Sequence, residues 1–368
     1  MMRNLMDPAS WWRAGRPGLA GNSVLRAAAK QMERLSAWPG YSPAIALWIR
    51  YERLATATLD YDARLLARLA GRGPTQAERR KDRERQGRRN VWQGQRPPGW
   101  RGPRREPVAF WHEGGTGPVV LLLNGWTASG LVWPGDWLAR LERRYRVVRV
   151  DNRGTGWSRT APAPFTIGDM AEDAAEVLRG IGAGPATVLG LSMGGMIAQE
   201  LALRHPKLVG QLVLVGTRPP ARSYIPAAAP VLDRELDHLL GSAPARQTSL
   251  EAFYRSIWEP QCAPGFADCR PELFDELVAQ IVTRPTPRAA VINQLRAIAA
   301  WSGGGRLARI KAPTVVVHGA LDELIPVGNG MQLARHSPGA RYIELPTVGH
   351  LVPIEAPDVL AEVIEGCA

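Results

Sequence analysis

One segment of the chain passes from an aliphatic run through a small-residue turn into an amphipathic run: Thr187-Val188-Leu189-Gly190-Leu191-Ser192-Met193-Gly194-Gly195-Met196-Ile197. The aliphatic part is typical of a buried strand, and the part after Gly194 is typical of a helix. In the Gly-x-Ser-x-Gly pattern between them, small residues on either side of the serine leave room for a tight turn. Such a turn exposes the serine hydroxyl and points the amide end of the new helix at it, which favours developing negative charge. Ser192 is therefore the candidate nucleophile, and the alternative interpretation is an ordinary glycine-rich turn.

Short β-rich runs recur after residue 107 and alternate with helical patterns. The runs cover residues 119–123, 146–150, 187–191, 212–215, 314–318 and 341–345, and the clearest helical patterns cover 167–180 and 194–204. Aliphatic strands that alternate with helices predict an α/β fold with a mostly parallel sheet covered on both faces. Residues 217–310 interrupt the alternation with four helix-like segments, near 231–240, 249–258, 271–282 and 287–301. We therefore expect a core of residues 107–216 and 311–368 with an inserted helical cap, 217–310.

A serine hydroxyl becomes a good nucleophile when a positioned base takes its proton and an acid orients that base. The run 314–318 is followed by Gly319-Ala320-Leu321-Asp322-Glu323, and the run 341–345 by Pro346-Thr347-Val348-Gly349-His350. We predict that Asp322 is the acid, with Glu323 as the alternative, and that His350 is the base. The other histidines fit this role poorly, because His318 lies inside a strand run, His205 ends a helix and the remaining three have no matching context.

Acyl transfer passes through a tetrahedral intermediate whose oxyanion needs two hydrogen-bond donors. The backbone N–H of Met193, directly after the nucleophile, is one candidate. The second is the N–H of Trp126, in the loop Asn124-Gly125-Trp126 that follows the run 119–123. The same loop could instead be a plain turn.

Five motifs together resemble the α/β-hydrolase fold superfamily. They are Leu122-Leu123-Asn124-Gly125-Trp126, Asp151-Asn152-Arg153-Gly154-Thr155-Gly156-Trp157-Ser158, Gly190-Leu191-Ser192-Met193-Gly194-Gly195-Met196-Ile197-Ala198, Gly319-Ala320-Leu321-Asp322 and Gly349-His350. The resemblance covers residues 108–365 and points to the branch with carboxylesterases, aclacinomycin-type methylesterases, enol-lactonases, prolyl iminopeptidases and cofactor-free haloperoxidases. It does not extend to residues 1–106.

The resemblance implies a Ser-His-Asp triad and gives the 151–158 motif an architectural role, with Asp151 and Arg153 as structural residues. Asn124 departs from the histidine that is usual in the family, which should affect the support of the loop more than the chemistry. Related dehalogenases and epoxide hydrolases carry Asp where Ser192 stands, and polyester synthases carry Cys. No phosphate-binding loop follows a suitable strand and no His or Cys cluster has metal-ligand spacing, so the sequence implies no cofactor and no metal.

The sequence therefore predicts a serine hydrolase that cleaves an ester or related acyl bond of a small molecule. Aromatic residues of the expected cap suggest a hydrophobic substrate, and we expect Phe253, Trp258 and Trp301 to contact it. The alternative is that several of the aromatic residues form the core of the cap itself. One alternative is an acyltransferase or cyclase that uses the same triad. Another is a non-catalytic hydrolase-fold binding protein.

The first 106 residues contain the whole positive excess of the chain. They hold 22 Lys and Arg against 9 Asp and Glu, whereas residues 107–368 hold 24 against 25. Helical patterns cover 23–38 and 43–70, the second with an apolar face opposite a basic one, and residues 71–106 read as an Arg-, Gly- and Pro-rich linker or arm. We expect this apolar face to pack on the rest of the protein; contact with an anionic membrane or a hydrophobic surface is the alternative. Arg residues and two Trp of the arm could also contact nucleic acid, an interpretation we disfavour.

The N-terminus lacks the apolar stretch of about 7 to 15 residues that a secretory signal needs. No run approaches the roughly 20 apolar residues that span a bilayer. We therefore expect a cytoplasmic protein whose three cysteines, Cys262 and Cys269 among them, are free thiols rather than bridged.

Overall fold

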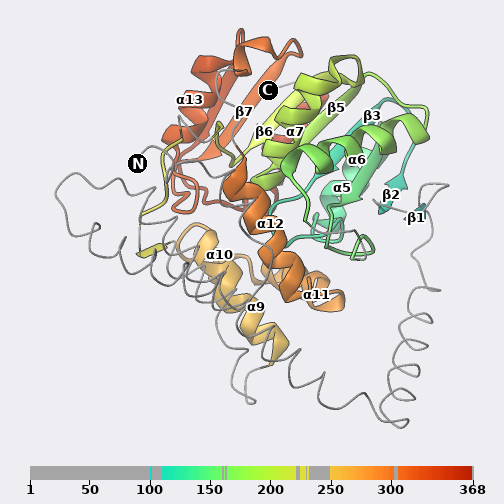
Figure 1. Cartoon of the computed structure of the whole chain (residues 1–368). Helices are drawn as coiled ribbons and strands as arrows, with labels where there is room; N and C mark the ends of the chain where they lie inside the picture. Colours follow the sequence, from blue (N-terminus) through green and yellow to red (C-terminus); the bar gives the residue numbers. More distant parts are fainter. Residues whose placement is uncertain are drawn as a thin grey trace, which may run out of the picture. The chain divides into compact units, whose positions relative to one another are not determined.

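Eight strands pair into one sheet in the described part of the chain, in the order β1-β2-β4-β3-β5-β6-β7-β8. Figure 1 shows this sheet together with the helices around it. The computed structural model describes residues 100–101, 110–159, 161, 164–220, 224–228, 230–231, 249–301 and 306–366. The predicted helices 23–38 and 43–70 lie outside these residues, as does the predicted helix near 231–240 from residue 232 on. β2 pairs antiparallel with β1 and β4, and all other pairs are parallel. The predicted fold class, a mostly parallel sheet flanked by helices, is confirmed.

The elements follow one another in the expected alternation. The strands are β1 Trp100–Arg101, β2 Phe110–Gly114, β3 Val119–Leu123, β4 Arg146–Asp151, β5 Ala186–Leu191, β6 Val209–Val215, β7 Thr314–Gly319 and β8 Arg341–Leu345. The helices are α5 Gly135–Glu142, α6 Ile167–Gly180, α7 Met193–Arg204, α9 Leu250–Trp258, α10 Phe266–Cys269, α11 Pro271–Thr283, α12 Arg288–Ala300, α13 Gly328–His336, α14 Val352–Glu355 and α15 Pro357–Glu365, with short 3-10 turns at Pro206–Leu208, Glu259–Gln261 and Leu307–Arg309.

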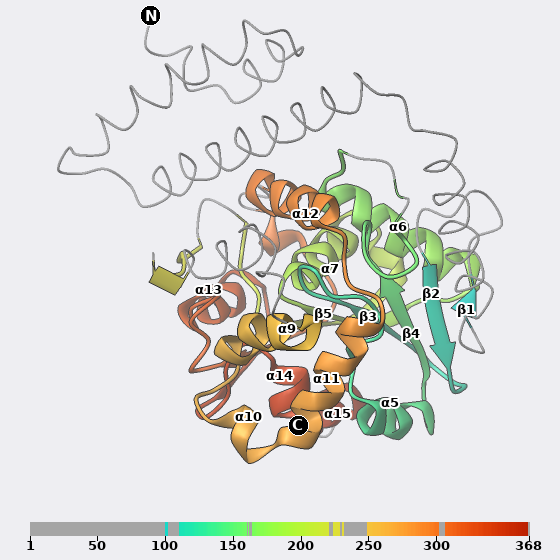
Figure 2. The same cartoon turned by 90° about the horizontal axis from the view of Figure 1, so that it is seen from below.

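Alternate residues of the central strands point to opposite faces of the sheet, and both faces are buried. Leu121 and Leu123 of β3 pack with α6, α7 and α13, whereas Val120 and Leu122 pack with α5, α14 and α15. Figure 2 shows these two groups of helices on opposite sides of the strands. Burial on both faces explains why the central strands read as continuous aliphatic runs rather than as alternating polar and apolar residues.

Two strands lie outside the predicted runs. β2 precedes the first predicted strand, and β1 falls within the segment predicted to be a linker or arm. Trp100 is paired with His112, and Arg101 with Trp111, so the described structure differs there from the predicted arm. A strand of two residues is too short to show an alternating sequence pattern. β1 therefore could not be predicted from its own residues, and only its pairing with β2 identifies it.

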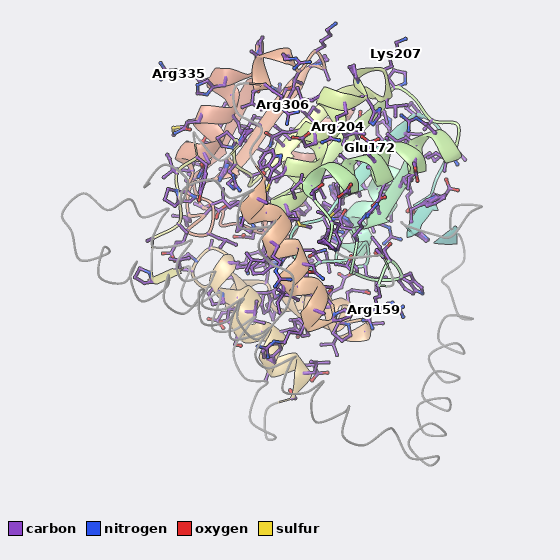
Figure 3. The ribbon with its side chains drawn as sticks, viewed as in Figure 1. Arg159, Glu172, Arg204, Lys207, Arg306 and Arg335 are labelled. Atoms are coloured by element: carbon purple, nitrogen blue, oxygen red, sulfur yellow. The ribbon has the colours of Figure 1, made fainter. Side chains whose placement is uncertain are left out.

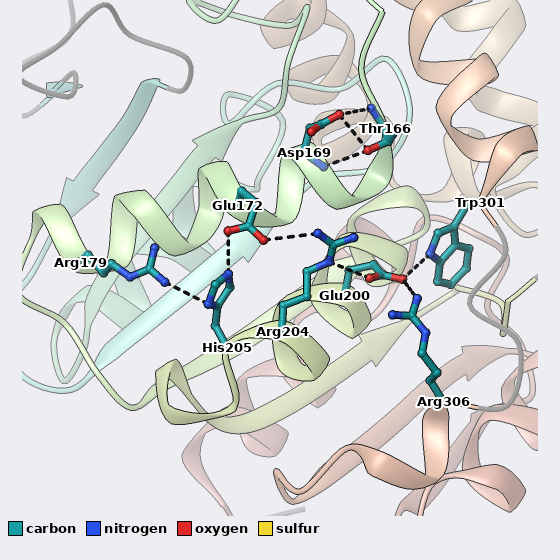
Figure 4. Close-up of polar contacts among 9 residues, drawn as sticks. All are labelled: Thr166, Asp169, Glu172, Arg179, Glu200, Arg204, His205, Trp301 and Arg306. Atoms are coloured by element: carbon teal, nitrogen blue, oxygen red, sulfur yellow. Dashed lines mark hydrogen bonds and ion pairs between the residues drawn. The ribbon is translucent and has the colours of Figure 1, made fainter. Parts of the chain in front are cut away.

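Helix α6 begins with a capping box. The Thr166 hydroxyl accepts a hydrogen bond from the Asp169 N–H at 3.1 Å, and the Asp169 carboxylate accepts one from the Thr166 N–H at 2.8 Å (Figure 4). A cap of this kind stabilises a helix by about 1 kcal/mol. It fixes the start of a helix that packs directly on α7.

The described helices α9, α10, α11 and α12 lie in sequence between β6 and β7, which are neighbours in the sheet; we call these helices the insertion. Tyr254, Trp258 and Phe274 form the centre of its own apolar cluster, which also includes Leu351 and Ile354 of the core. Within the insertion, Cys262 and Cys269 are both free thiols, as expected. The insertion therefore has a small core of its own that is continuous with residues beside His350.

Candidate active site

Ser192 lies at the turn between β5 and α7 in an unusual backbone conformation, with φ 54° and ψ −118°. Only Ser192 and Thr127 have a positive φ among the described residues other than glycine. Such a conformation costs on the order of 1–3 kcal/mol and persists only where the surroundings hold it. Here the Ser192 N–H donates to the Val215 carbonyl at 2.9 Å, and the Thr217 hydroxyl donates to the Ser192 carbonyl at 2.7 Å.

The glycines of the Gly-x-Ser-x-Gly pattern are required by close backbone contacts. A Cβ at Gly194 would collide with the carbonyls of Leu123 and Asn124, and a Cβ at Gly190 would collide with the Gly194 backbone. Ser192 precedes α7 without capping it through its side chain. The hydroxyl is therefore not used as a helix cap. The nucleophilic role of Ser192 stays a prediction.

Asp322 and His350 meet in the interior, although 28 positions separate them in sequence. Nδ1 of His350 donates to Oδ2 of Asp322 at 2.7 Å, and both residues are buried. Oδ1 of Asp322 accepts the Ile325 N–H at 2.7 Å. The alternative acid, Glu323, is exposed. These contacts favour Asp322 over Glu323 as the partner of the predicted base.

Burial by itself would raise the pKa of Asp322, but the charge and hydrogen bonds of His350 and His318 outweigh it and hold the pKa below its usual value. Asp322 is therefore an acceptor at neutral pH. Because a carboxylate has no proton to donate, the Nδ1–H of His350 is directed at it. The other ring nitrogen, Nε2, is left with the lone pair that a general base needs.

The end of β6 connects the serine to the Asp322–His350 pair. Val215 and Thr217 bond the backbone of Ser192, and Gly216 lies between them. A Cβ at Gly216 would lie 3.4 Å from His350 Nδ1 and 3.5 Å from Asp322 Oδ2. The structure thus brings Ser192, Asp322 and His350 around the carboxyl end of β6, following β5, β7 and β8 respectively.

His318 was not among the predicted site residues, because it lies inside β7. It is fully buried, its Nε2 lies 2.7 Å from the Ile325 carbonyl, and the same nitrogen is 3.4 Å from Asp322 Oδ2. The Asp322 carboxylate is therefore approached by two imidazoles. The only feature of the sequence that could have pointed to His318 was its spacing of four residues from Asp322.

Glu355 of α14 was also missed, and it organises the loop that carries His350. Its carboxylate accepts the N–H groups of Gly349 at 2.9 Å, Leu351 at 3.0 Å and Ala263 at 2.7 Å. The His350 N–H donates to the Gln261 carbonyl at 2.7 Å. Burial raises the pKa of Glu355, although these backbone donors oppose the rise. The insertion and the His350 loop are thus joined through Glu355 and Gln261.

The predicted oxyanion loop follows β3 and passes close to the serine. A Cβ at Gly125 would lie 3.3 Å from Ser192 Cβ, so glycine permits the close approach. Asn124 supports the loop, because its side-chain amide donates to the Ser129 carbonyl at 2.6 Å. The Asn152 side chain donates to the Asn124 carbonyl at 2.9 Å. Trp126 is half-buried and Met193 is fully buried at the first position of α7.

The 151–158 turn has the contacts of an architectural element. Asp151 accepts the N–H groups of Gly130 at 2.7 Å and Trp157 at 2.8 Å. Complete burial raises the pKa of Asp151 to about 6, although the two N–H donors oppose the rise. Arg153 forms an ion pair with Asp173 of α6 at 2.6 Å. Arg159, labelled in Figure 3, donates to the Pro285 carbonyl, which connects this region to the segment between α11 and α12.

The three residues predicted to contact substrate, Phe253, Trp258 and Trp301, each pack against or bond other residues of the protein. Trp258 is buried in the apolar cluster of the insertion, and Phe253 packs against that cluster with its ring edge-on to Tyr254. Trp301 follows α12, and its indole N–H donates to Glu200 of α7 at 3.0 Å (Figure 4). Arg204 and Arg306 donate to the same carboxylate at 3.0 Å and 2.5 Å. A role of these aromatic residues in substrate binding stays a prediction.

In the part of the chain that the structure describes, no three His, Cys, Asp or Glu side chains gather as metal ligands would. None of the described helices has the length and apolar character needed to cross a membrane.

Comparison with known proteins identifies the family of this chain. The profile of the family described as alpha/beta hydrolase fold matches residues 118–357. The chain is 30% identical over 271 residues to a putative non-heme bromoperoxidase, BpoC, from Mycobacterium tuberculosis, covering 67% of this chain and 92% of that protein. It is 31% identical over 255 residues to a pimeloyl-[acyl-carrier protein] methyl ester esterase from Aeromonas hydrophila, covering 68% and 95%.

A solved structure shows the same fold. The enol-lactonase from Burkholderia xenovorans LB400 aligns with a TM-score of 0.59 and 22% identity, covering 73% of this chain and 98% of that one.

Proposed function

Because this chain belongs to the α/β-hydrolase fold family and is a hydrolase, we propose that it cleaves an ester or related acyl bond of a hydrophobic small molecule through Ser192, His350 and Asp322. One observation supports this most strongly: a buried carboxylate holds the imidazole of His350 at 2.7 Å, beside a serine in a strained turn. A structural histidine would not need both a buried carboxylate at its Nδ1 and a strained serine at the end of β5 in the same sheet.

In the proposed reaction, Nε2 of His350 takes the proton of the Ser192 hydroxyl while Oγ attacks the carbonyl carbon of the substrate. The carbonyl electron pair moves to oxygen, where the N–H groups of Trp126 and Met193 bind the oxyanion. His350 then protonates the leaving oxygen as its bond to carbon breaks. Water, deprotonated by His350, attacks the acyl-enzyme, and Ser192 recovers its proton as the acid product leaves.

The proposed hydrophobic substrate rests on the aromatic side chains of the insertion. Trp258 shares an apolar cluster with Leu351, next to His350, and Phe253 packs against that cluster. Trp301 bonds Glu200 of α7. The similar protein from Aeromonas hydrophila carries the name of a methyl ester esterase, which agrees with ester chemistry.

Active-site labelling tests the proposal directly. We expect a fluorophosphonate to modify the wild-type protein at one residue, identified as Ser192 by peptide mass spectrometry. Ser192→Ala and His350→Ala are expected to lower hydrolysis of a small p-nitrophenyl ester by about a thousandfold or more while the circular dichroism spectrum stays unchanged. Ser192→Ala with near wild-type turnover would contradict the mechanism.

A substrate panel refines the reaction class. Purified protein is offered p-nitrophenyl esters of increasing chain length, lactones, aminoacyl amides and thioesters, each with and without an acceptor alcohol. A free acid as the only product supports hydrolysis, whereas an ester of the acceptor alcohol as the main product indicates an acyltransferase. A protein that neither turns over any substrate nor reacts with the fluorophosphonate would be a binding protein.

A further inference from the structure

A glutamine of the insertion contacts the loop that contains the predicted oxyanion donor. Gln294 of α12 is completely buried, with an exposed fraction of 0%. Its Oε1 accepts the Thr127 N–H at 2.9 Å, and its Nε2 donates to the Arg153 carbonyl at 2.9 Å. Both ends of the carboxamide are therefore occupied by backbone groups, one after β3 and one after β4.

Two further hydrogen bonds join the same parts of the chain. The indole N–H of Trp126 donates to the Val291 carbonyl of α12 at 2.9 Å. The Thr286 hydroxyl, just before α12, donates to the Thr127 carbonyl at 2.7 Å. Residues 286–294 therefore contact Trp126 at its side chain and Thr127 at both its N–H and its carbonyl.

The backbone that these bonds hold is strained. Thr127 has φ 67°, and the only other described non-glycine residue with a positive φ is Ser192. A threonine is disfavoured in this region, because its branched side chain crowds the backbone. Such a conformation persists where neighbouring groups hold it in place. The Thr127 N–H belongs to the Trp126–Thr127 peptide, which meets the peptide that carries the Trp126 N–H at the Cα of Trp126. Holding the Thr127 N–H and the Trp126 indole therefore restricts the rotations that would turn the Trp126 N–H away.

We propose that Gln294 is a positioning residue of the oxyanion hole: by fixing the peptide of Thr127, it holds the Trp126 N–H in the direction of the developing oxyanion. This inference rests on the proposed function and extends it to the insertion. The insertion then contributes to the chemical step as well as to the choice of substrate.

The proposal has a distinct kinetic signature. Removing an oxyanion donor costs about 100- to 1,000-fold in kcat in enzymes of this kind. Gln294 acts on the donor indirectly, through the neighbouring Trp126–Thr127 peptide, so we expect its loss to lower kcat by about 10- to 100-fold. KM should change by no more than about twofold, because the ground-state carbonyl depends less on the oxyanion donors than the transition state does.

The test compares Gln294→Leu with Gln280→Leu, the same substitution on α11 of the insertion, using a small dissolved p-nitrophenyl ester. An aryl boronic acid, which forms a tetrahedral adduct on an activated serine, serves as the transition-state analogue. For Gln294→Leu we expect the affinity for the boronic acid to fall in proportion to kcat/KM, while the pH at half-maximal kcat/KM stays constant. Gln280→Leu should match the wild type in all these measurements.

A folded Gln294→Leu variant that keeps kcat and boronic acid affinity within about twofold of the wild type would overturn the proposal. So would a rise in KM at constant kcat, which would make Gln294 a substrate contact. If Gln294→Leu does not fold, Gln294→Asn retains both amide groups but is too short to reach both partners, and the same loss in kcat is expected of it. A wild-type kcat in that variant would also overturn the proposal. If the wild-type protein hydrolyses nothing, or Ser192→Ala stays active, the proposed function fails instead.

Discussion

The Asp322 carboxylate lies between two imidazoles, with Oδ2 2.7 Å from His350 Nδ1 and 3.4 Å from His318 Nε2. Because the surrounding donors keep its pKa low, Asp322 remains an anion where a serine hydrolase works. A buried anion with several donors holds its orientation, and so does the histidine bonded to it. The orientation of the His350 imidazole, the proposed base, is therefore set by Asp322 and the residues around it.

The first prediction concerns Asp322→Asn. The amide retains the shape of the carboxylate but removes the charge that holds the Nδ1–H of His350, so the wrong tautomer becomes accessible. We expect kcat/KM on a small ester to fall by about 100- to 10,000-fold, somewhat less than for Ser192→Ala. Steady-state kinetics of both variants and of Glu323→Gln provides the measurement. If Glu323→Gln shows the larger loss, the assignment of the acid is wrong.

The second prediction concerns the pH dependence of stability at Asp151. Burial raises its pKa to about 6 in the folded protein, whereas 3.8 is ordinary for the unfolded chain. The folded state therefore binds the proton more tightly. The contribution of Asp151 to the free energy of unfolding is fully present below about pH 4 and is lost as pH rises through about 6, an effect on the order of 3 kcal/mol.

Asp151→Asn cannot titrate and provides the comparison. We expect the wild type to lose stability relative to this variant between pH 4 and pH 6.5, measured by urea unfolding at several pH values. The variant also loses one of two acceptors, which adds a difference that does not depend on pH. A gap between the two proteins that stays constant with pH would contradict the raised pKa.

At the scale of elements, the insertion contacts both loops of the proposed catalytic machinery. Helix α12 holds the loop after β3 through Gln294, and the Gln261–Ala263 segment holds the His350 loop together with Glu355. A second attachment fixes the end of α12, because Trp301 bonds Glu200 of α7, the helix that follows Ser192. The insertion is therefore attached at the places where a small displacement would disturb catalysis.

The third prediction follows for Glu355→Gln. In the wild type, three backbone N–H groups donate to the Glu355 carboxylate. In the variant, the NH₂ group of the amide cannot accept a hydrogen bond, so the His350 loop should lose at least one of them. We expect kcat/KM to fall by about 10- to 100-fold, in line with the loss of a hydrogen bond to a charged group. Glu362→Gln, an exposed position of α15, is the matched control. Equal activity of the two variants, both folded, would show that Glu355 does not position the base.

The fourth prediction separates substrate choice from folding in the aromatic residues of the insertion. Trp258→Ala and Trp301→Ala are expected to change the ranking of acyl chain lengths more than they lower turnover of the smallest ester. Their burial also predicts a loss of stability of about 3–5 kcal/mol each. Chain-length series and thermal unfolding of both variants measure the two effects. An equal loss of activity on every substrate would assign these residues to folding alone.

At the scale of the whole molecule, the charge of the chain is divided unequally. Residues 1–106 hold the positive excess, whereas the remainder is nearly neutral. Most of that basic region lies outside the described residues, but β1 at Trp100–Arg101 is paired with the sheet. A truncation that separates the two parts should therefore retain β1 and remove residues 1–92.

The fifth prediction concerns this truncation. If the apolar face of the 43–70 pattern packs on the rest of the protein, removing residues 1–92 should lower the thermal midpoint or cause aggregation, and the full-length protein should ignore anionic vesicles even at low salt. This is the outcome that we expect. The opposite result is a soluble truncation that hydrolyses small esters normally, together with salt-sensitive vesicle binding by the full-length protein only. It would assign the region to surface attachment.

Local sequence patterns were enough to predict the central part of the fold, and the same patterns led to the proposed triad. Each of β3 to β7 is rich in aliphatic or β-branched residues. The proposed nucleophile, acid and base each follow a strand, so short segments contain the signal. The strained turn at Ser192 could also be foreseen, because two flanking glycines admit the close backbone contacts found there.

Other features depend on contacts between distant residues. Gln294 meets Thr127 across 167 positions, Trp301 meets Glu200 across 101, and Glu355 meets Ala263 across 92. The sequence around Gln294 and Glu355 has no distinctive pattern, because a glutamine or a glutamate on a helix is ordinarily solvated. Nothing in the sequence around Trp301 indicates that its indole N–H meets Glu200. Their partners are backbone groups or a buried carboxylate that come within reach only after the sheet and the insertion have packed together. The proposed chemistry therefore rests on short segments of sequence, whereas the support of the site loops was set by long-range packing.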